Sequence, residues 1–139
     1  MKIATLTVVL ILAGSAAYVR FAPSNANQWN AALPATDPLT NCSQITTLKG
    51  GATLSCTAPE GALTKLDMIA TATPRTHRLA GSPEAGRITW ITRSRLWGFP
   101  DYTTAEVTEM GLTLYARQRF GSRDAGVNAA RLSDWLARL

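Results

Sequence analysis

Between residues 76 and 120, apolar residues recur at every second position in segments that short Gly- and Pro-containing turns separate. A period of two is typical of β-strands whose two faces meet different surroundings. Because the turns are short, successive strands are expected to run antiparallel. The predicted strands cover residues 76–80, 87–97, 102–108 and 112–120.

A helix is expected before this sheet and another after it. Residues 57–60, Thr-Ala-Pro-Glu, have the pattern of a capping box, and apolar residues follow at helical spacing. These features predict a helix over 58–72 that ends before Pro74. Residues 128–139 carry an apolar stripe on one helical face. The expected fold class is α+β, an antiparallel β-sheet meander with two helices packed on one face, preceded by an N-terminal transmembrane or signal helix.

The N-terminal residues 3–19 carry no charge and lie between Lys2 and Arg20. This run is long enough to span a membrane, and the partner expected through it is the membrane itself. A signal peptide cleaved near residues 15–17, Ser-Ala-Ala, is the alternative. After Arg20 no basic residue appears until Lys49. The positive-inside rule therefore predicts an inner-membrane anchor with a periplasmic domain, or a domain secreted to the periplasm if the signal is cleaved.

The chain is short enough for one domain. Residues 23–40 contain three prolines among Ser, Asn and Ala, which is typical of a linker, and Trp29 within it is expected to pack on the domain or at the lipid interface. The predicted organisation is an anchor or signal at 1–22, a linker at 23–40 and a single α+β domain at 41–139.

Cys42 and Cys56 flank two short Thr-rich segments joined by a Lys-Gly-Gly turn. A hairpin here would bring the two thiols together, and a pair so placed in an oxidising compartment is expected to form a disulfide. Two unpaired thiols are the alternative. Two Cys so far apart and a single distant His, His77, do not complete a tetrahedral set of ligands, so we expect no metal site.

The two faces of the predicted sheet differ in composition. One is mostly apolar and is expected to meet the helices. It contains Ile88, Trp90, Leu96, Thr103, Ala105, Val107, Leu112, Leu114, Ala116 and Phe120. The other face is rich in Arg, Tyr and Thr. It contains Arg87, Thr89, Arg93, Arg95, Tyr102, Thr104, Glu106, Thr113, Tyr115, Arg117 and Arg119.

Guanidinium groups beside aromatic rings suit phosphate, carboxylate or glycan ligands, and the chain has a net charge of +5. We expect this face to meet an anionic lipid, a glycan or an envelope protein, and we expect no nucleic-acid partner. The candidate ligand-binding residues are Arg93, Arg95, Tyr115, Arg117, Arg119 and Asp101. The alternatives are a solvated face with cross-strand charge pairs, and a structural protein whose sheet edge pairs with another subunit.

The sequence lacks the usual signatures of catalysis. It contains no Gly-x-Ser-x-Gly elbow and no dinucleotide or phosphate-binding fingerprint. We therefore expect a non-catalytic domain without a cofactor. The competing hypothesis is an enzyme of unknown reaction that uses Asp101, Asp124 and Arg119, because paired carboxylates can do acid–base work.

A stretch rich in Gly, Asp and Asn joins the last predicted strand to the last helix. Asp124 can cap the free amides at the start of that helix, or accept the guanidinium of Arg119. We interpret the stretch as a polar lock made of Arg119, Gly121, Asp124, Gly126, Asn128 and Arg131. An anion site gathered by Arg119, Arg123 and Arg131 is the alternative, although Asp124 would repel the anion.

Two segments resemble the domain-of-unknown-function family 1499. Residues 119–131, Arg-Phe-Gly-Ser-Arg-Asp-Ala-Gly-Val-Asn-Ala-Ala-Arg, are similar to its closing motif, and residues 94–101, Ser-Arg-Leu-Trp-Gly-Phe-Pro-Asp, to an earlier one. The chain has Gln118 and Arg123 where the family usually has Ser. The resemblance covers roughly 58–139 and implies membership and frequent membrane association, with no established reaction.

Overall fold

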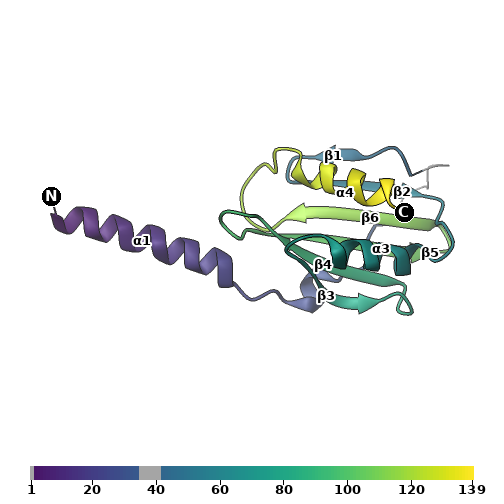
Figure 1. Cartoon of the computed structure of the whole chain (residues 1–139), viewed down its shortest axis with the longest axis horizontal. Coiled ribbons are helices and arrows are strands. Elements are labelled where there is room, and N and C mark those ends of the chain that lie inside the picture. Colours follow the sequence, from purple (N-terminus) through teal and green to yellow (C-terminus); the bar gives the residue numbers. More distant parts are fainter. Residues whose placement is uncertain (1, 35–41) are drawn as a thin grey trace.

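The computed structural model describes residues 2–34 and 42–139. One long helix, α1 (Lys2–Phe21), projects from the end of a domain built on a single sheet (Figure 1). The other elements, in chain order, are α2 (Ala26–Trp29), β1 (Thr46–Leu48), β2 (Gly51–Cys56), α3 (Ala62–Ala72), β3 (Thr76–Ser82), β4 (Arg87–Arg93), β5 (Pro100–Thr108), β6 (Gly111–Gln118) and α4 (Val127–Ala137).

The six strands form one sheet in the order β1-β2-β6-β5-β4-β3, and every neighbouring pair is antiparallel. Strands β3 to β6 follow one another as a meander. The β1–β2 hairpin is added beside β6, so the last strand of the meander lies inside the sheet. Helices α3 and α4 cover one face (Figure 1). The predicted α+β fold is confirmed.

The core lies between this face and the two helices. Trp90 from β4 meets Trp135 from α4 edge to face, with 5.5 Å between the ring centroids, and both are fully buried. Each indole N–H has a partner: Trp90 donates to Asp67 Oδ1 at 2.9 Å, and Trp135 donates to Thr73 Oγ1 at 3.0 Å. The two buried indoles are therefore satisfied, as stable packing of such groups requires.

The helix predicted to start at residue 58 begins later, at Ala62. Gly61 precedes it in the left-handed conformation, with φ of 66°, and no side chain caps the helix. The predicted capping box at 57–60 is therefore wrong. The local pattern was present, but the chain reverses direction at Gly61, where a residue without a Cβ adopts positive φ at little cost.

The predicted strand 87–97 is also too long, because β4 ends at Arg93. Residues 94–99 fold into a tight loop in which the Ser94 amide donates to the Phe99 carbonyl at 2.9 Å. As a result Leu96, predicted to face the core, is 76% exposed. Phe120, predicted to face the core, lies beyond the end of β6 and contacts the ring of Tyr18 in α1.

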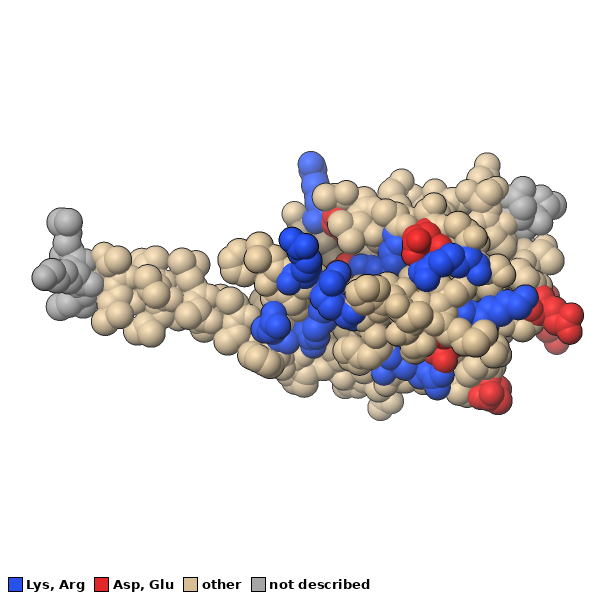
Figure 2. All heavy atoms as spheres, in the orientation of Figure 1, with Lys and Arg blue, Asp and Glu red and all other residues tan. Residues whose placement is uncertain are grey.

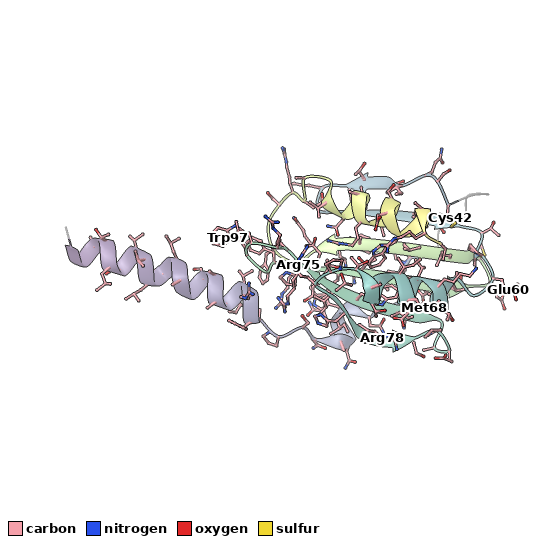
Figure 3. All side chains as sticks on the ribbon, in the orientation of Figure 1. Cys42, Glu60, Met68, Arg75, Arg78 and Trp97 are labelled. Atoms are coloured by element: carbon pink, nitrogen blue, oxygen red, sulfur yellow. A yellow bond between two sulfur atoms is a disulfide. The ribbon has the colours of Figure 1, made fainter. Side chains whose placement is uncertain are left out.

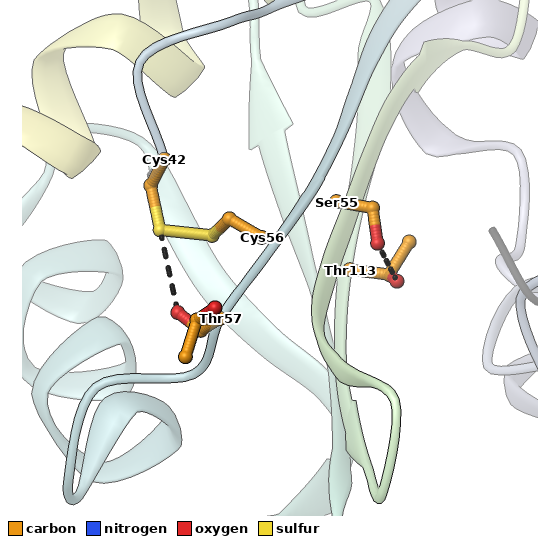
Figure 4. The surroundings of a disulfide bond; sticks show 5 residues. All are labelled: Cys42, Ser55, Cys56, Thr57 and Thr113. Atoms are coloured by element: carbon orange, nitrogen blue, oxygen red, sulfur yellow. Dashed lines mark hydrogen bonds between the residues drawn. A yellow bond between two sulfur atoms is a disulfide. The ribbon is translucent and has the colours of Figure 1, made fainter. Parts of the chain in front are cut away.

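Cys42 and Cys56 form a disulfide with 5.0 Å between their Cα atoms (Figure 4). The bond joins the segment before β1 to the end of β2, as the hairpin predicts. In the chain-entropy model, closing a loop of this size contributes about 3 kcal/mol to the stability of the fold.

Helix α1 has the length and composition of a membrane span. Residues 4–21 form an apolar window, of which none is buried against the domain. At 1.5 Å per residue this window is roughly 27 Å long, close to the thickness of a bilayer's hydrocarbon core. A signal sequence has the same features.

Candidate functional site

The sheet face opposite α3 and α4 is crossed by residues 22–34, which we call the strap. Trp29 of the strap stacks on Tyr102 of β5, with 3.8 Å between the ring centroids and 9° between the planes. Its carbonyl oxygen accepts a hydrogen bond of 2.8 Å from Arg117 Nη2. Beneath the strap, Tyr102, Thr89 and Thr104 are fully buried. The strap thus packs against the domain and covers the centre of this face.

Both ends of the strap are held by charged side chains of the sheet. Near its start, Arg119 Nη1 donates to the Pro23 carbonyl at 2.8 Å. Near its end, the Leu33 amide donates to Glu106 Oε2 at 2.7 Å, while Glu106 Oε1 accepts from Arg87 Nη1 at 2.6 Å. The residue types that suggested an external ligand therefore bind a segment of the same chain.

Arg117 is enclosed by aromatic rings of the strap and of the sheet. The guanidinium carbon lies 5.2 Å from the ring centre of Trp29 and 4.8 Å from that of Tyr115. Burial lowers the pKa of Arg117 from its ordinary value, although an arginine remains charged at neutral pH. With two aromatic faces and the Trp29 carbonyl around it, this cation stabilises the covered face.

The end of this face nearest α1 is open, and there it forms a pocket of about 520 Å³, a size typical of ligand sites. We call it the basic pocket. It is lined by Arg20, Phe21, Arg75, Thr76, His77, Arg93, Ser94, Arg95 and Gly98. None of these lining residues is acidic. Figure 2, which views the side of the molecule covered by α3 and α4, shows basic residues gathered at its α1 end.

The arginines of the basic pocket differ in how they are held. Arg93 Nη1 donates to the Gly98 carbonyl at 3.0 Å, and Arg75 Nε donates to the Arg93 carbonyl at 3.1 Å. Within the described residues, none of the four pocket arginines forms an ion pair with a carboxylate. Gathered cations without carboxylate partners are suited to bind an anion.

Arg75 has a strained backbone. Its φ is 61°, in a region that side chains with a Cβ adopt at a cost of about 1–2 kcal/mol. The residue lies directly after Pro74, where the chain turns from α3 into β3, and its carbonyl accepts from the Arg93 amide at 3.0 Å. Such strain concentrates at functional sites, and here it holds a cation at the rim of the pocket.

The lock predicted at the C-terminal motif is a network around Asp124. The Asp124 carboxylate accepts from the amides of Gly126 and Asn128, each at 3.1 Å. Asn128 Oδ1 accepts from Arg131 Nη1 at 2.6 Å, and Arg131 Nη2 reaches Asp101 Oδ2 at 3.2 Å. The network therefore joins β5 to α4.

Arg119 lies outside this network: of the two roles considered for Asp124, the structure has the bonds to free amides and not the fork with Arg119. Its guanidinium instead donates to the Tyr102 hydroxyl at 3.2 Å and to the strap. Asp101, one residue earlier on β5, turns to the helix side of the sheet. The three residues of the enzyme hypothesis, Asp101, Asp124 and Arg119, are therefore not gathered in one cleft.

The two carboxylates of the network have opposite pKa shifts. Burial raises the pKa of Asp101 above its ordinary value, against the charge and hydrogen bond of Arg131. Burial also acts to raise the pKa of Asp124, but hydrogen bonds from Gly126 and Asn128 hold it below its ordinary value. Asp124 is therefore the better stabilised anion.

The structure divides the sequence-predicted ligand residues among three environments. Arg93 and Arg95 line the basic pocket, and Tyr115, Arg117 and Arg119 lie at the strap-covered part of the face. Asp101 lies on the helix side of the sheet, paired with Arg131. Sequence reasoning missed Arg20, Arg75 and His77 as pocket residues, because alternation along the strands carries no information about the end of α1 or the turn after Pro74. Within residues 2–34 and 42–139, no group of three or more His, Cys, Asp or Glu side chains is placed to hold a metal ion.

Comparison with known proteins agrees with the resemblance found in the closing motif. Searches of curated proteins and of solved structures found no match. The family model described as "Protein of unknown function (DUF1499)" matches residues 19–139. The matched region includes the strap as well as the sheet and its two helices. The chain therefore belongs to the DUF1499 family.

Proposed function

We propose that this protein is a membrane-anchored, non-catalytic domain that faces the periplasm and binds an anionic group in the basic pocket. The observation that carries the proposal is a set of four arginines around one opening that has no acidic lining residue. Arg20 comes from α1, Arg75 from the turn before β3, Arg93 from β4 and Arg95 from the loop after β4. A phosphate group is one of the anions whose geometry matches guanidinium forks, and its charge suits a cluster of several arginines.

The disulfide and the position of the end of α1 at the pocket support the membrane and periplasmic parts of the proposal. A disulfide between Cys42 and Cys56 is typical of an oxidising compartment. Arg20 and Phe21, at the end of α1, line the pocket, and Ala22 is buried at the start of the strap. A chain that keeps α1 as an anchor therefore places the pocket directly at the membrane surface.

The test is a calorimetric titration of the full chain, in zwitterionic detergent micelles, with inorganic pyrophosphate. Arg95 is exposed and makes no hydrogen bond or ion pair with another described residue, so Arg95→Gln removes a cation without disturbing the fold. A charged hydrogen bond lost at such a site is expected to weaken pyrophosphate binding about tenfold. Binding should also weaken as salt is added, because the pocket is open to solvent.

Arg123→Gln is the matched control, because it removes the same charge from an exposed position outside the pocket. It is expected to leave the dissociation constant unchanged. A wild-type chain that binds no pyrophosphate, or equal losses in the two variants, would refute the pocket as the binding site.

A further inference from the structure

The loop of residues 94–99 presents its apolar side chains to the outside. Hydrogen bonds from the Ser94 amide to the Phe99 carbonyl and from the Gly98 amide to the Ser94 carbonyl close it into a compact turn. Leu96 is 76% exposed, Trp97 57% and Phe99 39%. A hydrogen-bonded turn that exposes three large apolar side chains together is a mark of an interaction surface.

This loop lies beside α1. Trp97 and Phe99 line an apolar crevice of about 290 Å³ whose other wall is the face of α1 formed by Leu12, Ser15, Ala16 and Val19. Figure 3 shows Trp97 at the α1 end of the domain, the same end as Arg75, while Cys42 and Glu60 lie at the other. The exposed loop is therefore directed along the anchor.

The position of the crevice along α1 gives its depth in a membrane. Leu12 lies roughly 12 Å along the helix axis from Arg20, at 1.5 Å per residue. The headgroup layer on each side of a bilayer is only about 5–8 Å thick. With Arg20 at the surface, the crevice spans the headgroup layer, where Trp is enriched in membrane proteins, and reaches the ends of the acyl chains beneath it.

The loop also borders the basic pocket. Gly98 lines that pocket, and a Cβ at this position would lie 3.1 Å from Arg20 Nη1. One short turn thus has a cationic pocket on one side and an apolar crevice along α1 on the other. A phospholipid offers the matching pair of groups, an anionic phosphate and a hydrocarbon chain.

We propose that the 94–99 loop enters the lipid interface beside α1 and that the basic pocket holds the phosphate of an anionic phospholipid. The second half rests on the proposed function of the pocket, whereas the first half rests on the loop and the crevice alone. The loop and α1 together fix the domain at one height and orientation on the membrane, with the strap running away from the lipid surface.

The first experiment measures the depth of the loop. The full chain is reconstituted into phosphatidylcholine vesicles with and without phosphatidylglycerol, using lipids brominated on their acyl chains. Trp90 and Trp135 are buried in the core, and Trp29 is stacked on Tyr102. Bromine is therefore expected to quench mainly Trp97, and Trp97→Phe should abolish most of the quenching.

Leu96→Asp is a second variant, and it keeps Trp97 as the fluorescent reporter. Leu96 is the most exposed of the three side chains, so the change should leave thermal unfolding in micelles unaltered. A charge at the tip should withdraw the loop from the acyl region and reduce the quenching of Trp97. If neither Trp97→Phe nor Leu96→Asp reduces the quenching, the placement of the loop in the membrane is overturned.

The second experiment asks which headgroup the pocket holds. Native mass spectrometry of the full chain, extracted from mixed vesicles, compares retained phosphatidylglycerol with retained phosphatidylcholine. If each basic residue contributes about fivefold to anionic-lipid binding, the Arg20→Gln/Arg95→Gln chain should lose its preference for phosphatidylglycerol, and Arg123→Gln should keep it.

The outcomes separate the two proposals. Pyrophosphate binding in micelles, together with no preference for phosphatidylglycerol, would overturn the lipid assignment and leave the anion site standing. Loss of both would overturn the proposed function itself. Quenching of Trp97 with a preference for phosphatidylglycerol that depends on Arg20 and Arg95 is the result that the structure predicts.

Discussion

Arginines occupy both the strap-covered centre of one sheet face and its open end beside α1, but their surroundings differ. In the covered part, Arg117 and Arg119 donate to carbonyl oxygens at the middle and the start of the strap. At the open end, Arg20 and Arg95 line a pocket and form no ion pair with a described carboxylate. Arginine therefore stabilises the fold in the covered region and is available to a ligand at the open end. The difference arises because the strap covers the first set of arginines and not the second.

The largest expected effect comes from breaking the covered region. Trp29→Ala removes the stack on Tyr102 and exposes the polar groups beneath it. The lost burial and ring stacking should lower the free energy of unfolding by about 2–3 kcal/mol. Denaturant unfolding of the full chain in micelles measures this change. Gln28→Ala, at an exposed position of the same short helix, is the control and should have little effect.

A smaller loss is expected at the network between β5 and α4, whose residues do not line the basic pocket. Asp124→Ala removes the acceptor for the amides of Gly126 and Asn128 and should cost about 1 kcal/mol, the usual value of a helix cap. Asp124→Asn retains an acceptor and should cost less. Both variants should bind pyrophosphate normally, and a binding defect in Asp124→Ala with an unchanged melting temperature would instead support a site at the motif.

Acid should affect the same network in a predictable direction. The pKa of Asp124 is lowered in the folded protein, so its stabilisation is complete above the ordinary value of 3.8 and is lost as the pH falls through the folded value. The pKa of Asp101 is raised, so its ionisation opposes folding at neutral pH, and this cost disappears as the pH falls towards 3.8. Unfolding of Asp124→Asn should therefore depend less steeply on pH below 3.8 than that of the wild type.

The smallest expected change in stability is at Arg75. Glycine adopts positive φ without the Cβ penalty, but it loses the hydrogen bond from the Arg75 side chain to Arg93 and gains freedom in the unfolded chain. Arg75→Gly should therefore alter the free energy of unfolding by less than about 1 kcal/mol. Pyrophosphate affinity should fall by contrast, which would show that the strained arginine serves the pocket. A large loss of stability without loss of affinity would contradict this assignment.

Local patterns in the sequence predicted most of the sheet, both covering helices and the disulfide, because period, turns and cysteine spacing are short-range signals. The capping of α4 by Asp124 is predictable for the same reason. The start of α3 was not, because Thr57 and Glu60 match a capping box while the chain in fact turns at Gly61. The path of the chain from β2 to α3, and not the local preference for a capping box, sets the start of the helix.

The strap and the basic pocket were beyond local reasoning. The strap is polar and Pro-rich, so it has no repeating apolar pattern. Trp29 is its one aromatic side chain, and a single residue does not reveal which part of the domain it contacts. Tyr102 faces away from the helices, so alternation alone placed it on the face expected to meet an external partner. Arg20 and Arg75 approach each other only because α1 leaves the domain beside the turn after Pro74. Arg93 and Arg95 were predicted as ligand residues, because the alternation along the predicted strand 87–97 assigned both to the same face.

The most direct test of the difference between the two regions compares Arg95→Gln with Arg119→Gln in the full chain, measuring pyrophosphate affinity and thermal unfolding for each. Arg95→Gln should weaken binding about tenfold with an unchanged melting temperature. Arg119→Gln should lower the melting temperature, because it releases Pro23 and Tyr102, and should leave binding close to that of the wild type. Equal effects of the two substitutions on both measurements would contradict the division between a structural and a ligand-binding set of arginines.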